Sequence, residues 1–121
     1  MTLQDLYTQI GGDYEGVLGR LMNSERMVQK FVLKFLADGS YELLLRSMEA
    51  QDYPEAFRAA HTIKGIGQTL GFTPLYELAG ALSDALRNGF TPGAPALAEQ
   101  LEAEYRHTAE AIRAFQASLE A

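Results

Sequence analysis

The residues best suited to chemistry lie in one short segment that centres on a histidine. Four positions there are spaced at i, i+3, i+4 and i+7, which places them on one face of a helix: His61, Lys64, Gly65 and Gln68. An imidazole in water has a pKa of about 6.5 and is mostly neutral near pH 7, so one ring nitrogen keeps a lone pair for nucleophilic attack. Lys64 would place a positive charge within one turn of the ring. This combination suits the acceptance of an anionic group, such as a phosphoryl group, by the ring.

Two glycines interrupt the helix that must carry these residues. Gly65 and Gly67 each cost about 1 kcal/mol relative to alanine inside a helix, so each requires a reason. Gly65 shares the face of His61, where a missing side chain would leave room for a partner surface. Gly67 falls on the opposite, apolar face, where we expect close approach to a neighbouring helix at a position such as Gly80.

Apolar residues recur at spacings of three and four along the whole chain, which predicts helices and no strands. Capping residues, first-turn prolines and glycine breaks divide the chain into seven helices: residues 2–11, 14–22, 24–38, 40–51, 54–70, 73–88 and 97–119. The last of these carries a heptad-like seam: Leu97, Leu101, Tyr105, Thr108, Ile112, Phe115 and Leu119.

Short connections between long amphipathic helices favour antiparallel neighbours. We therefore expect an all-α protein, an up-down antiparallel four-helix bundle with short extra helices at the N-terminus. Residues 1–121 would form a single domain, with the short helices in 1–22 and the bundle in 24–119. The seam of the last helix also allows a dimeric coiled coil, but fewer than four heptads are more typical of a core, so we expect a monomer.

Composition narrows the functional classes. Sixteen acidic and ten basic residues leave a net charge of −6, which disfavours nucleic acid and anionic membrane surfaces as partners. The chain has no cysteine and two histidines, so a metal site is not expected. The sequence has no phosphate-binding glycine loop, so an ATPase is not expected. It also has no nucleophile elbow and no paired carboxylates, so a hydrolase is not expected. No secretory signal or membrane span is visible, so we expect a cytoplasmic protein.

The run AHTIKGIGQTLGF resembles the histidine phosphotransfer (HPt) domain of two-component relays, whose pattern is A-H-x-[LI]-K-G followed shortly by L-G. Every anchor of that pattern is matched: Ala60, His61, Ile63, Lys64, Gly65, Leu70 and Gly71. The amino-terminal phosphotransfer domain of chemotaxis histidine kinases is similar too, including the Gly71-Phe72 pair. That domain normally begins a much longer kinase, so we expect a free-standing HPt protein. The likeness covers about residues 24–119, and its specificity comes from this motif.

The resemblance implies a role for each matching residue. His61 would be phosphorylated, Lys64 would steady the phosphoryl oxygens, and Gly65 would admit a receiver domain. Further receiver-docking positions would be Phe57, Arg58, Gln68 and Ile66, although Ile66 could instead point into the bundle. In such domains a polar residue of the next helix often orients the histidine, and the matching position here is Ser83. Because serine reaches less far than glutamine, orientation through Ser83, Gln68 or water stays open.

The implied function is that of a phosphorelay intermediate. His61 would accept a phosphoryl group from a receiver-domain aspartate or a histidine kinase and pass it to another response-regulator receiver. The chain would be a phosphoprotein carrier and not an enzyme, since nothing in the sequence supplies a metal or base for unaided transfer. It would need no cofactor, with magnesium only on the partner receiver. The alternative function is a non-catalytic helical docking adaptor for a two-component partner.

Overall fold

Two short helices lie at the amino end, and the first of them is bounded by the caps that the sequence predicts. The computed structural model describes residues 1–120. Helix α1 spans Leu3–Ile10 and begins with a capping box, in which the backbone N–H of Asp5 donates to Thr2 Oγ1 and that of Thr2 donates to the Asp5 carboxylate. It ends at Gly11, whose φ of 67° lies in the left-handed region that glycine adopts readily. Helix α2 spans Tyr14–Arg20.

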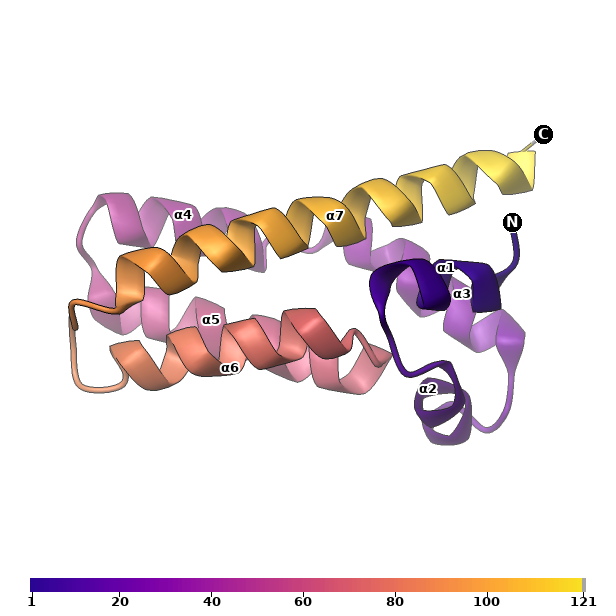
Figure 1. The fold of residues 1–121 in the computed structure, drawn as a ribbon, viewed down its shortest axis with the longest axis horizontal. Helices are drawn as coiled ribbons and strands as arrows, with labels where there is room; N and C mark the ends of the chain where they lie inside the picture. Colours follow the sequence, from indigo (N-terminus) through magenta and orange to yellow (C-terminus); the bar gives the residue numbers. More distant parts are fainter. Residues whose placement is uncertain (121) are drawn as a thin grey trace.

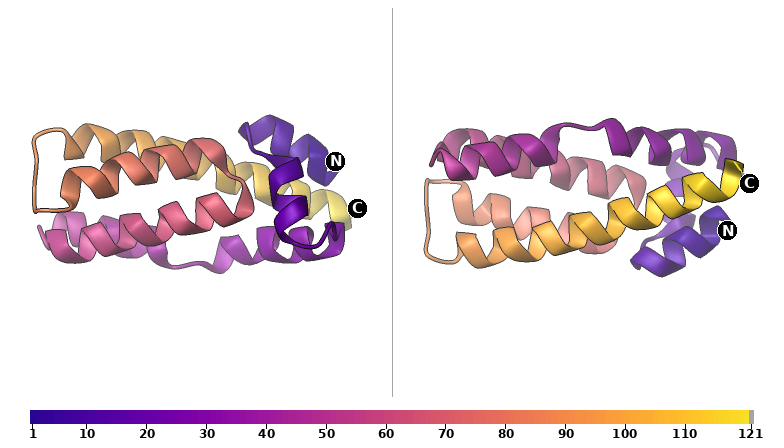
Figure 2. Two further views of the ribbon diagram at one scale, coloured as in Figure 1. Left: turned by 90° about the horizontal axis from the view of Figure 1, so that it is seen from below. Right: turned by 90° about the horizontal axis from the view of Figure 1, so that it is seen from above.

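The sequence allows one kinked helix or two helices in series over residues 24–51 and favours two, and the structure has two. Helix α3 spans Glu25–Lys34 and is capped by Ser24, whose side chain accepts from the Met27 N–H. A single turn of 3₁₀ helix, η1 (Phe35–Ala37), precedes α4 (Ser40–Glu49). Figure 2 shows that α3 and α4 lie end to end along one side of the molecule.

Helices α5 (Tyr53–Leu70) and α6 (Thr73–Leu86) are antiparallel neighbours joined by a tight turn (Figure 1). The sequence predicts Thr73 as the N-cap of the second helix, and this is wrong. The backbone N–H of Tyr76 donates to the carbonyl of Phe72 at 2.9 Å, so the helical ladder begins one residue earlier and Phe72 takes the cap position. Thr73 is therefore the first helical residue.

Helix α7 is the longest element and spans Ala94–Glu120. Most of its predicted seam is buried or half-buried, but Leu119 is 45% exposed. The buried part of the seam therefore ends at Phe115. None of the helices in residues 1–120 is long and apolar enough to cross a membrane.

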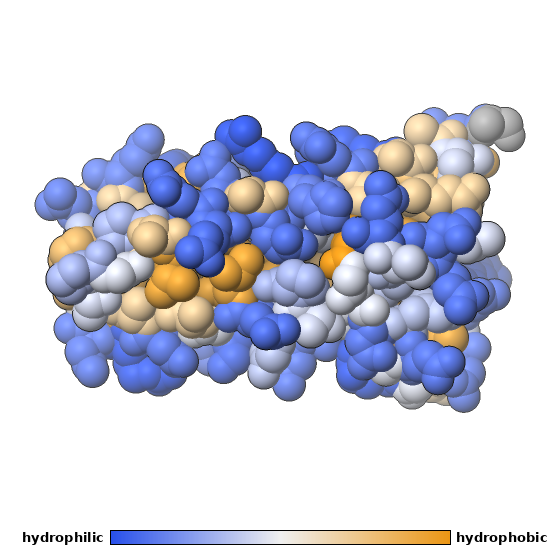
Figure 3. All heavy atoms as spheres, viewed as in Figure 1, coloured by the Kyte–Doolittle hydropathy of each residue, from blue (hydrophilic) through white to orange (hydrophobic). Residues whose placement is uncertain are grey.

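The regular elements of residues 1–120 are all helical, which confirms the all-α prediction. The chain reverses direction between α4 and α5, between α5 and α6, and between α6 and α7 (Figure 2). Helix α5 packs against both α4 and α6, and α6 packs against α7. On the face of α6 and α7 that Figure 3 presents, most side chains are polar and apolar atoms gather mainly in the seam between the two helices.

The amino-terminal segment holds the carboxyl end of α5. The Tyr7 hydroxyl donates to the carbonyl of Leu70 at 2.6 Å, and the backbone N–H of Asp13 donates to the carbonyl of Gly71 at 2.8 Å. Arg20 Nε donates to the carbonyl of Thr69 at 3.1 Å. Carbonyls at a helix end lack partners within the helix, so these three bonds satisfy groups that would otherwise depend on water. The segment thereby fixes the end of the helix that carries His61.

A second tyrosine, Tyr41, is half-buried, and its buried hydroxyl lacks such a partner. The Tyr41 ring stacks on that of Tyr105, with centroids 4.0 Å apart and planes 11° from parallel. Its hydroxyl is buried and makes no hydrogen bond within residues 1–120. Burial raises the pKa of Tyr41 to about 12, because the ionised form would lose its hydration.

Candidate functional site

His61 stands on the exposed face of α5, near the middle of the helix. Its imidazole makes no hydrogen bond to any group of residues 1–120. The other histidine, His107, differs in this respect, because its Nε2 lies 3.1 Å from the carbonyl oxygen of Gln9. The contact that the ring does make is with Phe57, whose ring centroid lies 5.9 Å away at an interplanar angle of 21°. Both ring nitrogens of His61 are therefore unoccupied by groups of the described chain.

Lys64 follows one turn after His61 and is half-buried through its stem. A Cβ built on Gly80 would lie 3.6 Å from both Cδ and Cε of Lys64, so the methylenes lie across the backbone of α6. Three ion pairs occur in residues 1–120, and none of them includes Lys64. Its ammonium thus has no carboxylate partner in that part of the chain.

The two interior glycines of α5 have different surroundings, as the sequence predicts. A Cβ added at Gly65 would meet no atom within 4 Å, so the surface beside His61 is open. A Cβ added at Gly67 would lie 3.0 to 3.2 Å from the N, Cα and Cβ atoms of Tyr76. Gly67 therefore permits the close packing of α5 and α6. The residue opposite it is Tyr76 and not Gly80, which faces Lys64.

The structure does not bring Ser83 or Gln68 to the imidazole. Ser83 is fully buried, and its hydroxyl donates to the carbonyl of Gly80 at 3.1 Å, the usual alternative for serine inside a helix. Gln68 is exposed but lies seven residues after His61, about 10 Å along the helix axis. The ring of His61 leans the other way, toward Phe57. Of the expected orienting residues, neither reaches the ring.

Phe57 and Arg58 lie on the amino-terminal side of His61. Phe57 is half-buried, and the guanidinium carbon of Arg87 lies 5.4 Å from its ring centroid. Arg58 is exposed and pairs with Glu55. A hollow of about 520 Å³ opens here between the start of α5 and the end of α6, lined by Pro54, Phe57, Arg58, Leu86, Arg87, Asn88 and Gly89.

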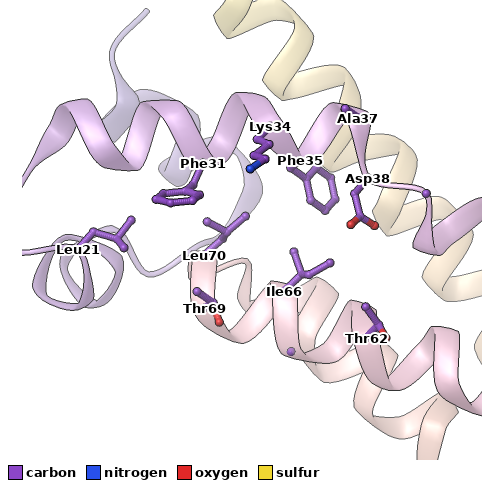
Figure 4. Close-up of a pocket in the computed structure, with 12 residues that line it drawn as sticks. Leu21, Phe31, Lys34, Phe35, Ala37, Asp38, Thr62, Ile66, Thr69 and Leu70 are labelled. Atoms are coloured by element: carbon purple, nitrogen blue, oxygen red, sulfur yellow. The ribbon is translucent and has the colours of Figure 1, made fainter.

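A larger groove, of about 710 Å³, lies between α5 on one side and α3 and η1 on the other (Figure 4). Thr62 and Gly65 form its rim nearest His61. Ile66 points into this groove, and it is half-buried because it also packs against the core. The remaining lining residues are Leu21, Phe31, Lys34, Phe35, Ala37, Asp38, Gly39, Thr69 and Leu70.

Sequence reasoning missed the α3 side of this groove. The periodicity of α3 indicates which of its residues are apolar, but the partner against which they pack is 30 or so positions away in the chain. The spacing of apolar residues in α3 therefore predicts that Phe31 and Phe35 both belong to the core. Phe35 is buried there, whereas Phe31 is half-buried and its remaining surface faces the groove.

The arrangement places a nucleophile, a cation and an open surface together on one helix. Within the 120 described residues, no three His, Cys, Asp or Glu side chains are grouped so that they could hold a metal ion. The polar groups of the site are thus an imidazole and an ammonium one turn apart. An imidazole nitrogen can form a bond to phosphorus, and an ammonium can offset the charge of the phosphoryl oxygens.

Comparison with known proteins agrees with this chemistry. A family model described as the Hpt domain matches residues 26–115, which is about three quarters of the chain. Comparisons with curated proteins and with solved structures gave no match. Hpt domains serve in the phosphotransfer steps of phosphorelays, in which receiver domains or kinases are their partners. The match begins at the start of α3 and contains α5 with His61, Lys64 and Gly65. On this ground the chain belongs to the Hpt domain family.

Proposed function

We propose that this protein carries a phosphoryl group on His61 between two-component signalling partners. A ring nitrogen attacks the phosphorus of an aspartyl phosphate on a receiver, or of a phosphohistidine on a kinase. The bond from phosphorus to the donor residue breaks as the bond to the imidazole forms, and the donor leaves with the electron pair. The reverse chemistry on a second response-regulator receiver returns His61 to its free form. The observation that carries the proposal is the exposed imidazole, which has no hydrogen bond within residues 1–120.

Lys64 supports this role through its charge. Its stem lies across Gly80, and none of the ion pairs in the described part of the chain uses its ammonium. An unpaired ammonium one turn from the phosphorylated nitrogen stabilises the added negative oxygens. The chain acts as carrier and substrate with no cofactor of its own, and the partner receiver brings magnesium and the catalytic groups.

The receiver docks over Gly65 and the groove between α3 and α5. The rim of the groove includes Thr62, the neighbour of His61, so a partner seated there brings its reactive group to the imidazole. Helix α3 carries three basic residues against one acidic residue, within a chain whose net charge is −6. This local positive charge suits a partner whose reacting group is an aspartyl phosphate. Arg58 and Gln68 extend the docking surface along α5.

We infer that residues 1–121 act as one cytoplasmic unit. In this unit α3 and α4 lie in series and count as one of the four helices of an up-down bundle. The other three helices are α5, α6 and α7. The segment 1–22, which contains α1 and α2, closes one end of the bundle. The three hydrogen bonds from this segment to the carboxyl end of α5 support this interpretation.

Transfer of labelled phosphate from a phosphorylated receiver tests the proposal. Wild type should become labelled in an acid-labile, alkali-stable form, and His61→Gln should not. His107→Gln is the matched control because His107 is also exposed on a helix, and this variant should be labelled like wild type. Equal labelling of wild type and His61→Gln would end the proposal. Receiver binding without any labelling of wild type would favour the docking adaptor instead.

A further inference from the structure

The contact between Phe57 and His61 is the one feature of the site whose role the carrier function does not explain. The two rings are 5.9 Å apart between centroids and 21° from parallel. The guanidinium of Arg87 lies over the same phenyl ring at 5.4 Å, and Arg87 is itself bonded to Asp84 at 3.1 Å. The side chains of α5 and the end of α6 thus form a chain of contacts that ends on the reactive ring.

The geometry of a helix explains why Phe57 can act on His61. Long side chains on a helix lean toward its amino terminus, so the ring of His61 passes over the residue four positions earlier. Contact through the ring face restrains the plane of the imidazole without using either nitrogen as a donor or an acceptor. A hydrogen bond from Ser83 or Gln68 would occupy one of those nitrogens, but neither residue reaches the ring.

We propose that Phe57 is a positioning residue for phosphoryl transfer: it holds the imidazole of His61 in one rotamer by stacking, and Arg87 restrains Phe57 in turn. This inference rests on the proposed function. It assigns to Phe57 a task different from docking, because the restraint acts on His61 before a partner arrives. Aromatic pairs of this kind shift a local equilibrium by about two- to tenfold, so loss of the ring should slow transfer by a similar factor.

Kinetics separate positioning from docking. With a phosphorylated receiver at saturating concentration, Phe57→Leu should lower the transfer rate by about three- to tenfold while the half-saturating concentration changes little. Phe57→Tyr keeps the ring and should restore the wild-type rate. Phe90→Leu is the matched control, because Phe90 is a 51% exposed ring that contacts the ring of Tyr53 at the same end of the bundle. This variant should transfer like wild type.

A measurement without phosphate tests the same inference independently. The ring current of Phe57 should shift the imidazole proton resonances of His61, and the side-chain couplings should report one dominant rotamer. In Phe57→Leu the shift should disappear and the rotamers should mix, with thermal unfolding nearly unchanged because the ring is half-buried.

The possible failures are distinguishable. Mixed rotamers of His61 in wild type would overturn the positioning role whatever the kinetics. An unchanged saturating rate with a raised half-saturating concentration in Phe57→Leu would show that Phe57 only docks the partner. Absence of label on wild type would refute the carrier function, whereas a labelled wild type with either of the first two results would refute this inference alone.

Discussion

The two glycines inside α5 allow a direct test of what is structural and what is functional in the site. Gly65→Ala adds a methyl group where no atom lies within 4 Å, so the folded state loses nothing and the helix gains about 1 kcal/mol of propensity. Gly67→Ala adds a methyl group at 3.0 to 3.2 Å from the backbone and Cβ of Tyr76. Helix α6 must then retreat, which costs about 1–3 kcal/mol and offsets or exceeds the same gain in propensity.

These figures convert into a measurable difference in thermal stability. An unfolding entropy of about 2.1 cal/mol/K per residue gives roughly 0.25 kcal/mol/K for a chain of this length, so 1 kcal/mol shifts the Tm by about 4 °C. Gly65→Ala should therefore unfold about 4 °C above wild type. Gly67→Ala should unfold at or below the wild-type temperature, by up to about 8 °C.

The phosphotransfer assay should rank the same variants in the opposite order. The methyl group of Gly65→Ala stands where we propose that the receiver docks, so transfer should slow although the protein is more stable. Gly67→Ala should transfer at nearly the wild-type rate at temperatures where it is folded, because its methyl group faces α6. Circular dichroism melts and transfer rates on one preparation of each variant decide the matter. A destabilised Gly65→Ala, or two variants with the same melting temperature, would refute the packing argument.

Two further predictions concern a cation and a pair of hydroxyls. Lys64→Met keeps an apolar stem across Gly80 but removes the positive charge. Rapid-quench measurements should show transfer slowed roughly tenfold or more, while the free energy of unfolding in urea changes little. An unchanged transfer rate would exclude Lys64 from the site. Tyr7→Phe should lower the free energy of unfolding by about 1–3 kcal/mol, because the carbonyl of Leu70 loses its donor inside the protein. Tyr41→Phe is the control, because it removes a buried hydroxyl that has no partner within residues 1–120. This substitution should leave the free energy of unfolding unchanged or raise it. An equal loss of unfolding free energy in both variants would contradict the hydrogen-bond argument.

The amino-terminal segment lies outside the part of the chain that matches the family model, yet it is bonded to the helix that carries the site. The carbonyl of Leu70 could not be satisfied by a continuing helix, because the residue four positions later is Pro74, which has no N–H. Tyr7 supplies the missing donor. The spacing of Tyr7 in the sequence shows only that it belongs to the apolar side of α1.

Much of the site could be predicted from the sequence because it lies on a single helix. The side-chain positions of an α-helix repeat every 3.6 residues, so the grouping of His61, Lys64 and Gly65 on one face follows from their spacing alone. The ends of α1 and α5 are equally local, since each is set by a capping side chain and a glycine within a few residues. The different surroundings of Gly65 and Gly67 follow from the same periodicity.

What only the tertiary structure decided depends on how helices rotate and pack against one another. Ser83 lies on α6 at the position expected to face His61, but the packing of α6 buries it and its hydroxyl bonds within its own helix. The groove beside Gly65 exists because α3 stands across from α5. The guanidinium of Arg87, at the end of α6, lies over the ring of Phe57 only because α5 and α6 pair. Spacing within one helix carries no information about these angles, because they are set by the fit of side chains that are far apart in the chain.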